Sequence, residues 1–288
     1  MKFGIYYSYW EQEWSADCLR YVEKVAKLGF DIIEIAAHHL NSYSPEHIAA
    51  VAGAARDNGI TITAGLGPSK DRNLSSADPE VRKAGRAFFE ETLDNLAKLD
   101  IRSIGGALHS YWPIDYSKPV DKAGDRARGL EGISSLADFA ADRGVTLCLE
   151  VLNRFENHVI NTAQEGVDFV REVGKPNVKV MLDTFHMNIE EDSFGDAIRT
   201  AGPLLGHFHT GEINRRVPGK GRLPWHEIGA ALRDIGYEGA VVMEPFVKMG
   251  GQIGSDIKVW RDLSDNADEA KLDEDARRSL EFSRFVLG

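Results

Sequence analysis

The stretch VTLCLEVLNRFENHVINTAQEGVDFVREVGKPNVKVMLD, residues 145–183, contains one complete strand–helix–strand unit. Two short runs of apolar and β-branched residues, Thr146–Glu150 and Val178–Asp183, are predicted strands, and Thr162–Val173 between them has the periodicity of a helix. Gly174 follows this helix directly and suits the left-handed conformation that often ends a helix. A helix that joins two such strands predicts that the strands run parallel in one sheet.

The same alternation continues in both directions along the chain. The predicted strands are Phe3–Tyr7, Asp31–Ala36, Ile60–Ala64, Ser103–Leu108, Thr146–Glu150, Val178–Asp183, Leu205–His209 and Ala240–Glu244. The predicted helices are Ala16–Leu28, Pro45–Asn58, Pro79–Leu99, Arg126–Arg143, Thr162–Val173, Ser193–Ala201, Trp225–Ile235 and Asp275–Leu287. Eight strands that alternate with helices predict an α/β fold, a (β/α)₈ TIM barrel formed as a single domain by residues 1–288.

A doubly wound open sheet is the alternative arrangement of the same elements. It would leave edge strands, and the GxGxxG loop expected after its first strand is absent. The glycine run Gly65–Gly67 (GLG) is too short to indicate phosphate binding. The closed barrel is therefore the preferred prediction.

Charge and cysteine content exclude several classes of partner. The net charge of −11 opposes binding to nucleic acid or to an anionic membrane, because phosphate groups are bound mainly by clustered Lys and Arg. No apolar run approaches the roughly 20 residues that span a bilayer, and the first apolar stretch is too short for a signal peptide. The two cysteines, Cys18 and Cys148, have no metal or redox spacing. We therefore predict a soluble, cytoplasmic protein with a small-molecule substrate.

Four polar residues close four successive predicted strands. Glu150 closes VTLCLE, Asp183 closes VKVMLD, His209 closes LLGHFH and Glu244 closes AVVME. The active site of such a barrel lies at the C-terminal ends of its strands, so these side chains are expected to converge. Each acid alone could equally cap a strand or pair with a nearby Lys or Arg. Together, crowded carboxylates need a cation or a shared proton, which favours a metal cage for a hard divalent ion such as Mn²⁺, Mg²⁺ or Co²⁺.

Further polar and aromatic residues follow the same strands. Glu156, His186 and Arg215 are expected to hold substrate oxygens, although each could instead be an exposed loop residue. Aromatic residues near strand ends are expected to line a sugar pocket, whereas core or interface packing better suits Tyr9 and Trp10. The expected wall residues are Tyr6, Trp14, Trp112 and Phe246.

The remaining histidines are weaker candidates. His38 and His39 follow the second predicted strand and could reach the mouth of the barrel. A structural or solvated position is expected for His47, His158, His207 and His226.

The strings ALHSYW, CLEVLNRFENH, MLDTFHMNIEED, GHFHTGE, NRRVPGKGR, PWHEI and MEPF occur in this order. Over nearly the whole chain the sequence resembles the D-tagatose 3-epimerase family, and within it the D-psicose (D-allulose) 3-epimerases. The resemblance implies that Glu150, Asp183, His209 and Glu244 bind Mn²⁺ or Co²⁺, and that Glu150 and Glu244 are also the acid/base pair. It further implies a homodimer or a homotetramer.

The resemblance also assigns the substrate-binding residues. By position, Glu156, His186 and Arg215 match the groups that bind the sugar near its carbonyl. The wall around the distal part of the sugar is matched by Tyr6, Trp14, Ala107, Trp112 and Phe246. Because the family varies in this wall, the ketose preference is less firmly implied than the reaction.

These features predict a metal-dependent ketose 3-epimerase that acts through an enediolate. The two glutamates would take and return the C3 proton on opposite faces of that intermediate. An aldose–ketose isomerase on a similar barrel, which would move hydrogen between C1 and C2, is the alternative. A metal-dependent endonuclease would need a basic face, and a sugar-binding protein without turnover would not explain the clustered carboxylates.

Overall fold

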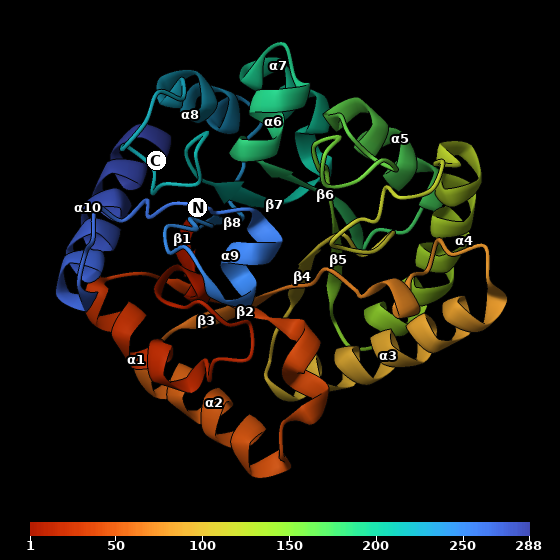
Figure 1. Ribbon diagram of the computed structural model, residues 1–288, viewed down its shortest axis with the longest axis horizontal. Helices are drawn as coiled ribbons and strands as arrows, with labels where there is room; N and C mark the ends of the chain where they lie inside the picture. Colours follow the sequence, from red (N-terminus) through yellow and green to blue (C-terminus); the bar gives the residue numbers. More distant parts are fainter.

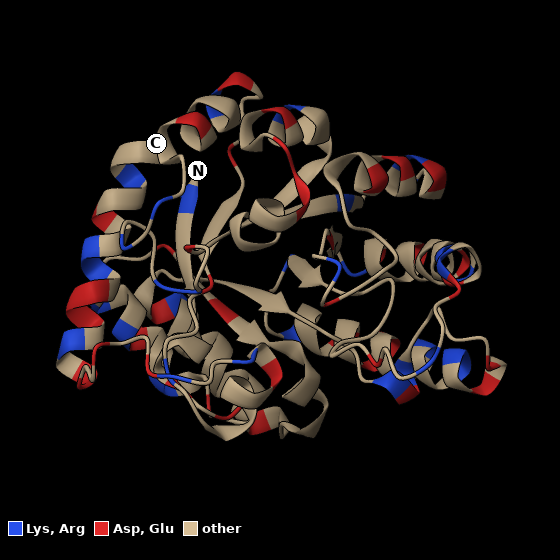
Figure 2. Ribbon diagram, turned by 45° about the horizontal axis from the view of Figure 1, so that its top comes forward, with Lys and Arg blue, Asp and Glu red and all other residues tan.

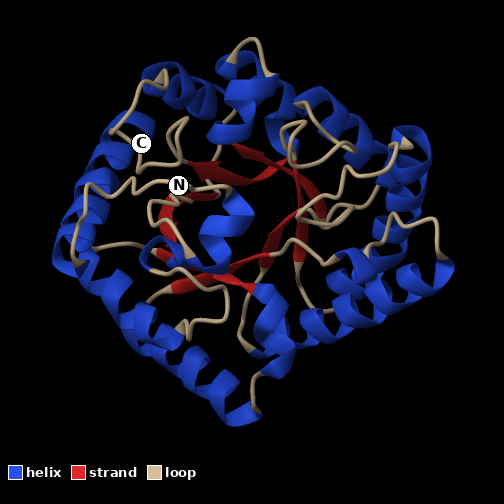
Figure 3. Ribbon diagram, in the orientation of Figure 1, coloured by secondary structure: helices blue, strands red, loops and turns tan.

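A computed structural model describes all residues 1–288. Eight parallel strands form a closed barrel in sequence order, and the helices form a ring outside it (Figures 1 and 3). The strands are β1 (Lys2–Tyr6), β2 (Ile32–Ala36), β3 (Thr61–Gly65), β4 (Ser103–Gly106), β5 (Thr146–Glu150), β6 (Val178–Asp183), β7 (Leu205–Thr210) and β8 (Ala240–Met243).

Closure of the sheet decides between the two predicted arrangements. The first strand pairs in parallel with the last, with Lys2 opposite Ala240 and Ile5 opposite Met243. No strand edge is left unpaired, so the TIM barrel prediction is confirmed and the doubly wound alternative is excluded.

Ten α-helices and four short 3₁₀ helices connect and cover the strands. The α-helices are α1 (Leu19–Leu28), α2 (Pro45–Asn58), α3 (Pro79–Lys98), α4 (Lys122–Ala141), α5 (Ala163–Val173), α6 (Thr184–Glu190), α7 (Phe194–Ala201), α8 (Trp225–Asp234), α9 (Gly251–Ile257) and α10 (Glu269–Leu287). The 3₁₀ helices are η1 (Tyr7–Trp10), η2 (Ala37–Ser42), η3 (Lys70–Arg72) and η4 (Gly202–Leu204).

Local sequence signals explain where many of these helices begin and end. The Thr162 side chain accepts a hydrogen bond from the Glu165 N–H at the start of α5, and Gly174 ends that helix with φ +65°. Helix α10 begins six residues before its predicted start, because Asp268 caps it by accepting from the Lys271 N–H. Helix α4 likewise begins at Lys122, after the cap residue Asp121.

Several strand ends differ from the prediction by one or two residues, and two short helices are absent from it. Strand β4 ends at Gly106, whose φ of +117° turns the chain before Leu108. Strand β8 ends at Met243, so Glu244 is the first residue beyond it, although its N–H still donates to the Thr210 carbonyl at 2.8 Å. The short helices α6 and α9 are both absent from the prediction, and α9 lies over the centre of the barrel in Figure 1.

The charged residues lie mainly on the outer helices, where Figure 2 shows both signs interspersed. The barrel strands are almost entirely buried, as in β2, where every residue from Ile32 to Ala36 is buried. None of the helices has the length and apolar character that crossing a membrane requires.

Candidate functional site

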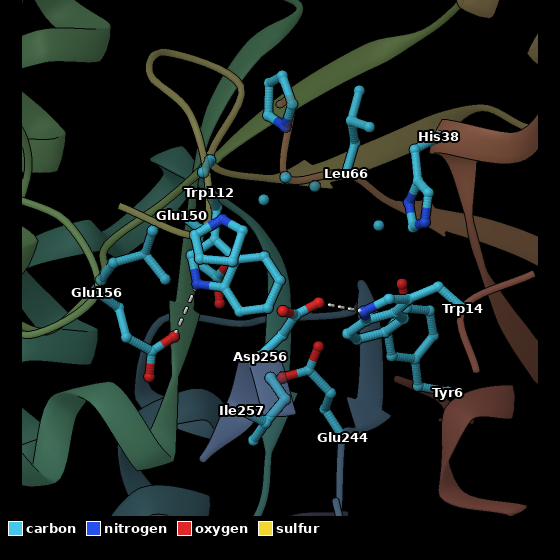
Figure 4. Close-up of a pocket in the computed structure, with 18 of the residues that line it drawn as sticks. Tyr6, Trp14, His38, Leu66, Trp112, Glu150, Glu156, Glu244, Asp256 and Ile257 are labelled. Atoms are coloured by element: carbon cyan, nitrogen blue, oxygen red, sulfur yellow. Dashed lines mark hydrogen bonds between the residues drawn. The ribbon is translucent and has the colours of Figure 1, made fainter. Parts of the chain in front are cut away.

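A cavity of about 450 Å³ opens at the C-terminal ends of the barrel strands. Every residue that the sequence assigns to the site lines this cavity, with the exception of Asp183, which lies beneath it with 1% of its surface exposed. The close-up in Figure 4 shows Glu150 and Glu244 in this cavity together with the aromatic side chains of Tyr6, Trp14 and Trp112.

The four strand-ending residues come together as the sequence predicts. Potential ligand atoms of Asp183, His209 and Glu244 lie within 4.8 Å of one another, and the same is true of Glu150, Asp183 and His186. Asp183 belongs to both groups, so the four predicted ligands form one cluster around it, with His186 beside them. Three carboxylates and an imidazole in a buried cluster are a donor set that suits a divalent cation.

The carboxylates of this cluster are not equivalent. Burial, together with the charge of Glu244, raises the pKa of Glu150 well above its ordinary value. Burial alone would also raise the pKa of Asp183, but Arg215, His186 and His209 outweigh it and lower that pKa. One oxygen of Asp183 accepts a hydrogen bond from the Phe185 N–H at 2.9 Å and so caps helix α6. Without a cation, Glu150 therefore retains a proton more readily than Asp183.

His209 lies between two carboxylates. Its Nε2 is 2.5 Å from Oε1 of Glu34, a fully buried residue in the middle of β2. Its Nδ1 is 3.6 Å from Oε1 of Glu244, and this nitrogen has no hydrogen-bond partner. Burial opposes a charge on the ring, but Glu34 and Glu244 raise the His209 pKa well above its ordinary value. The unpartnered Nδ1 therefore fits a metal ligand that gives up its proton when a cation binds.

Arg215 is part of this cluster and not a surface residue. Only 5% of it is exposed, and its Nη1 lies 3.0 Å from Oδ2 of Asp183 and 3.1 Å from Oε2 of Glu244. Its backbone has φ +64°, and its guanidinium stacks 3.7 Å from the centre of the Phe185 ring. The interpretation of Arg215 as an exposed loop residue is therefore wrong.

A buried glutamate absent from the sequence prediction holds the Arg215 loop. Glu212 accepts hydrogen bonds from the Gly219 N–H at 2.8 Å, from the Arg222 N–H at 3.0 Å and from the Trp225 indole at 2.9 Å. Its carbonyl also accepts from the Arg215 N–H at 2.8 Å. These contacts fix the loop and place the Arg215 guanidinium above Asp183.

His186 and Glu156 are joined by Asn153, another residue that the sequence prediction omits. The backbone N–H of Asn153 donates to Nδ1 of His186 at 3.3 Å, so a neutral ring carries its proton on Nε2. Burial lowers the His186 pKa, which favours this neutral form. Nε2 faces the cluster, 3.6 Å from Oε1 of Glu150. Glu156 accepts from Asn153 at 3.2 Å and from the Trp112 indole at 3.1 Å, a bond visible in Figure 4.

The expected aromatic wall forms one side of the cavity. The ring of Trp14 makes edge-to-face contacts with Trp112 at 6.1 Å and with Phe246 at 5.9 Å between ring centres, and Tyr6 lies 6.3 Å from Trp14. Gly67, from the short glycine run, is needed for this packing because a Cβ there would lie 2.9 Å from Cβ of Trp112.

Helix α9 adds cavity residues that the sequence did not reveal. Asp256 and Ile257 both line the cavity, and Asp256 accepts a hydrogen bond from the Trp14 indole at 2.9 Å (Figure 4). His38 and His39 also line the cavity, as the sequence had suggested was possible. The other histidines described as structural or solvated do not line it.

Known proteins are similar to this chain in sequence and in architecture. The family described as xylose isomerase-like TIM barrel matches residues 22–271. The chain is 77% identical to a D-psicose 3-epimerase of Agrobacterium fabrum, over the full length of both chains. A crystal structure of a D-psicose 3-epimerase in the presence of D-fructose superposes with a TM-score of 0.99 at 77% identity, with both chains fully covered.

A second solved structure gives the same result. The D-psicose 3-epimerase of Clostridium cellulolyticum H10, crystallised with D-tagatose, has a TM-score of 0.99 at 64% identity and covers 100% of this chain and 99% of its own. The resemblance stated from the sequence motifs is thus confirmed. The chain belongs to the D-psicose 3-epimerases, carbohydrate isomerases within the xylose isomerase-like TIM barrel family.

Proposed function

We propose that this chain interconverts free ketohexoses at C3, as in the pair D-fructose and D-psicose, with Glu150 and Glu244 as the two proton-transfer groups. The observation that carries the proposal is the arrangement of these glutamates: both line the cavity and belong to one cluster, Glu150 at the end of β5 and Glu244 directly after β8. The relatives described with D-fructose and D-tagatose support a free ketose as the substrate. Residues 1–288 would act as one catalytic domain.

The residues present fit a divalent cation. Glu150, Asp183, Glu244 and Nδ1 of His209 would hold it, since they supply three carboxylates and an imidazole nitrogen without a hydrogen-bond partner. Mn²⁺ or Co²⁺ is the proposed ion, with Mg²⁺ also compatible with such a donor set. When bound, the cation supplies Lewis-acid stabilisation of the negative charge that develops on the substrate oxygens.

Inversion at C3 requires two proton-transfer groups, one on each face of the intermediate. A planar enediolate is protonated on the face opposite to the one deprotonated only if two groups flank it, one without and one with a proton. Glu150 and Glu244 both line the cavity, and Glu244 lies beside the cationic Arg215, 3.1 Å away. In this mechanism Glu150 protonates one face, Glu244 deprotonates the other, and the roles reverse for the opposite epimer.

Two neighbouring donors would bind the substrate oxygens. Nε2–H of His186 faces the cluster because Nδ1 is occupied by Asn153, so it can donate to an oxygen near the carbonyl. Arg215 would stabilise the same region through its charge, and Glu156 would accept a substrate hydroxyl. The wall of Tyr6, Trp14, Ala107, Trp112 and Phe246 would pack on the distal part of the sugar and exclude water.

We also infer a homodimer or a homotetramer. Besides the family resemblance, two large apolar side chains support this inference: Trp260 and Phe155 are 71% and 70% exposed in the single chain. Light scattering after size-exclusion chromatography tests the assembly directly, and a monomeric mass would contradict it.

Isotope exchange tests the reaction and separates it from the aldose–ketose alternative. In D₂O, with Mn²⁺ added, D-fructose should yield D-psicose that carries deuterium at C3 and none at C1, as read by NMR. Glu150→Gln and Glu244→Gln should each lose nearly all turnover, since an amide neither accepts nor returns the proton. Deuterium at C1, or an aldose as the main product, would establish the isomerase instead. Wild-type rates in both variants would show that these glutamates do not transfer the proton.

A further inference from the structure

A second buried cluster lies directly beneath the one described, inside the barrel. It consists of Glu34, Thr63, His207 and His209, which lie on β2, β3 and β7 and are each exposed by 5% or less. The potential ligand atoms of Glu34, His207 and His209 lie within 4.8 Å of one another. The interior of such barrels is usually filled with branched apolar side chains, so a buried glutamate here requires a physical reason.

The contacts of Glu34 show how its charge is satisfied. Its Oε1 is 2.5 Å from Nε2 of His209, and its Oε2 accepts a hydrogen bond from Oγ1 of Thr63 at 2.6 Å. Thr63 is the register partner of Glu34 on the neighbouring strand. Nε2 of His207 lies 2.9 Å from Oε2 of Glu34. The Thr63 hydroxyl therefore holds one carboxylate oxygen, with Nε2 of His207 close beside it, which leaves the other oxygen to hold His209.

The contact between Glu34 and His209 determines which ring nitrogen of His209 faces the cluster at the cavity. Strand β2 is not a neighbour of β7 in the barrel, because β1 and β8 lie between them, so Glu34 reaches His209 across the barrel interior. A carboxylate only accepts hydrogen bonds, so Nε2 of His209 must carry the hydrogen in this pair. The other ring nitrogen, Nδ1, then points toward Glu244 at 3.6 Å without a hydrogen-bond partner.

We propose that Glu34 is a positioning residue for the metal centre: it fixes the hydrogen of His209 on Nε2 and sets the ring orientation, so that Nδ1 is the nitrogen offered to the cation. The inference rests on the proposed function, since it takes His209 as a metal ligand. A second carboxylate behind a ligating histidine raises the basicity of the ligand nitrogen and limits ring rotation, and the loss of such a partner typically weakens metal binding by about 10–100-fold. Thr63 acts one step further out, by holding Glu34 through its hydroxyl.

Metal affinity measured on the intact chain tests this role without relying on turnover. Wild type, Glu34→Gln and Glu34→Ala are stripped of metal and titrated with Mn²⁺, and free Mn²⁺ is followed by electron paramagnetic resonance. The glutamine retains a neutral acceptor of the same shape, so its Kd should rise about 10-fold, whereas alanine removes the acceptor and should raise the Kd about 100-fold. The visible absorption bands of bound Co²⁺ should shift in both variants, because they report the ligand field at the metal.

Asp275→Asn is the matched control. Asp275 is also a buried carboxylate, 5% exposed, but it binds Lys220 and Lys271 at helix α10, away from the cavity. This substitution should lower the unfolding temperature without a change in Mn²⁺ affinity or in the Co²⁺ spectrum.

The outcomes separate this inference from the proposed function. A wild-type chain that binds no Mn²⁺ would overturn the metal centre itself. If wild type binds Mn²⁺ and Glu34→Gln binds it within twofold, with an unchanged Co²⁺ spectrum, Glu34 has only a packing role. The glutamine variant decides the matter even if the alanine variant does not fold, because it preserves the volume and one acceptor oxygen.

Discussion

Replacing Arg215 by methionine should destabilise the metal-free protein far more than the metal-loaded protein. Nη1 of Arg215 lies 3.0 Å from Asp183 and 3.1 Å from Glu244, and only 6% of its side chain is exposed. Methionine keeps much of the aliphatic volume, so the substitution removes mainly the charge. The buried Asp183 and the partly buried Glu244 then lose their cationic partner.

The expected magnitude follows from the burial of this pair. Removal of one partner of a buried ion pair costs about 3–5 kcal/mol. At roughly 2–4 °C per kcal/mol for a large domain, the metal-free variant should unfold about 6–20 °C below metal-free wild type. A bound divalent cation would neutralise the same two carboxylates, so most of this deficit should disappear at saturating Mn²⁺. Mn²⁺ should therefore raise the unfolding temperature of the variant by more than it raises that of wild type.

Thermal unfolding is measured after prolonged chelation, with and without added Mn²⁺. This gives the unfolding temperatures of wild type and of Arg215→Met in both conditions. Arg199→Met is the matched control: Arg199 also pairs with a carboxylate, Asp234, at 2.9 Å, but the two side chains are 44% and 56% exposed. Exposed pairs contribute little, so this variant should unfold close to wild type in both conditions. An equal deficit for Arg215→Met with and without Mn²⁺ would show that the guanidinium and the metal do not neutralise the same charges, and the reasoning would fail.

Four further predictions concern the same cluster and its wall. The raised pKa of Glu150 means that the folded protein binds this proton more tightly than the unfolded chain does. The stability of the metal-free protein should therefore fall as the pH rises above 4.5. Glu150→Gln should flatten this pH dependence, as measured by chemical denaturation. For the same reason Mn²⁺ binding should release protons and tighten with pH, and a pH-independent Kd from calorimetry would contradict it. Trp112→Ala or Phe246→Ala should change the relative kcat/KM among ketohexoses and pentuloses more than Mn²⁺ affinity, and constant substrate ratios would assign both rings to packing alone. Asp256→Ala, which frees the Trp14 indole, should raise KM for ketohexoses severalfold with little effect on kcat.

The fold could be predicted because every strand is a short run of apolar or β-branched residues, and most helices are long enough to show a helical period. The errors occur where backbone conformation, and not hydrophobicity, sets the boundary. Gly106 ends β4 through its positive φ, and the apolar residues beyond it, Ala107 and Leu108, gave no signal of this turn. Helices α6 and α9 have only seven residues each, so neither presents enough turns to show a helical period.

The site residues that could be predicted share one property: they follow strands whose C-terminal ends must meet in any parallel barrel. That geometry places Glu150, Asp183 and His209 together without knowledge of any contact. Glu34 is different, because its partner lies across the closed barrel, although a charged residue within the apolar strand IIEIA was itself a signal. The burial of the Arg215 side chain in the cluster depends on its left-handed backbone conformation and on its contact with Glu212. Neither feature is revealed by a local sequence pattern.

The crowding of acids in this cluster connects the metal centre to the proton transfer. If the carboxylates were equivalent, a two-base inversion would have no defined donor and acceptor at the start of turnover. Here burial and Glu244 favour the protonated form of Glu150, whereas Arg215 and a helix N-terminus favour the ionised form of Asp183. A cation that binds among them competes with the proton of Glu150. In the proposed mechanism Glu150 both holds the cation and transfers a proton, so a substitution that changes the charge beside it should alter Mn²⁺ affinity and turnover together.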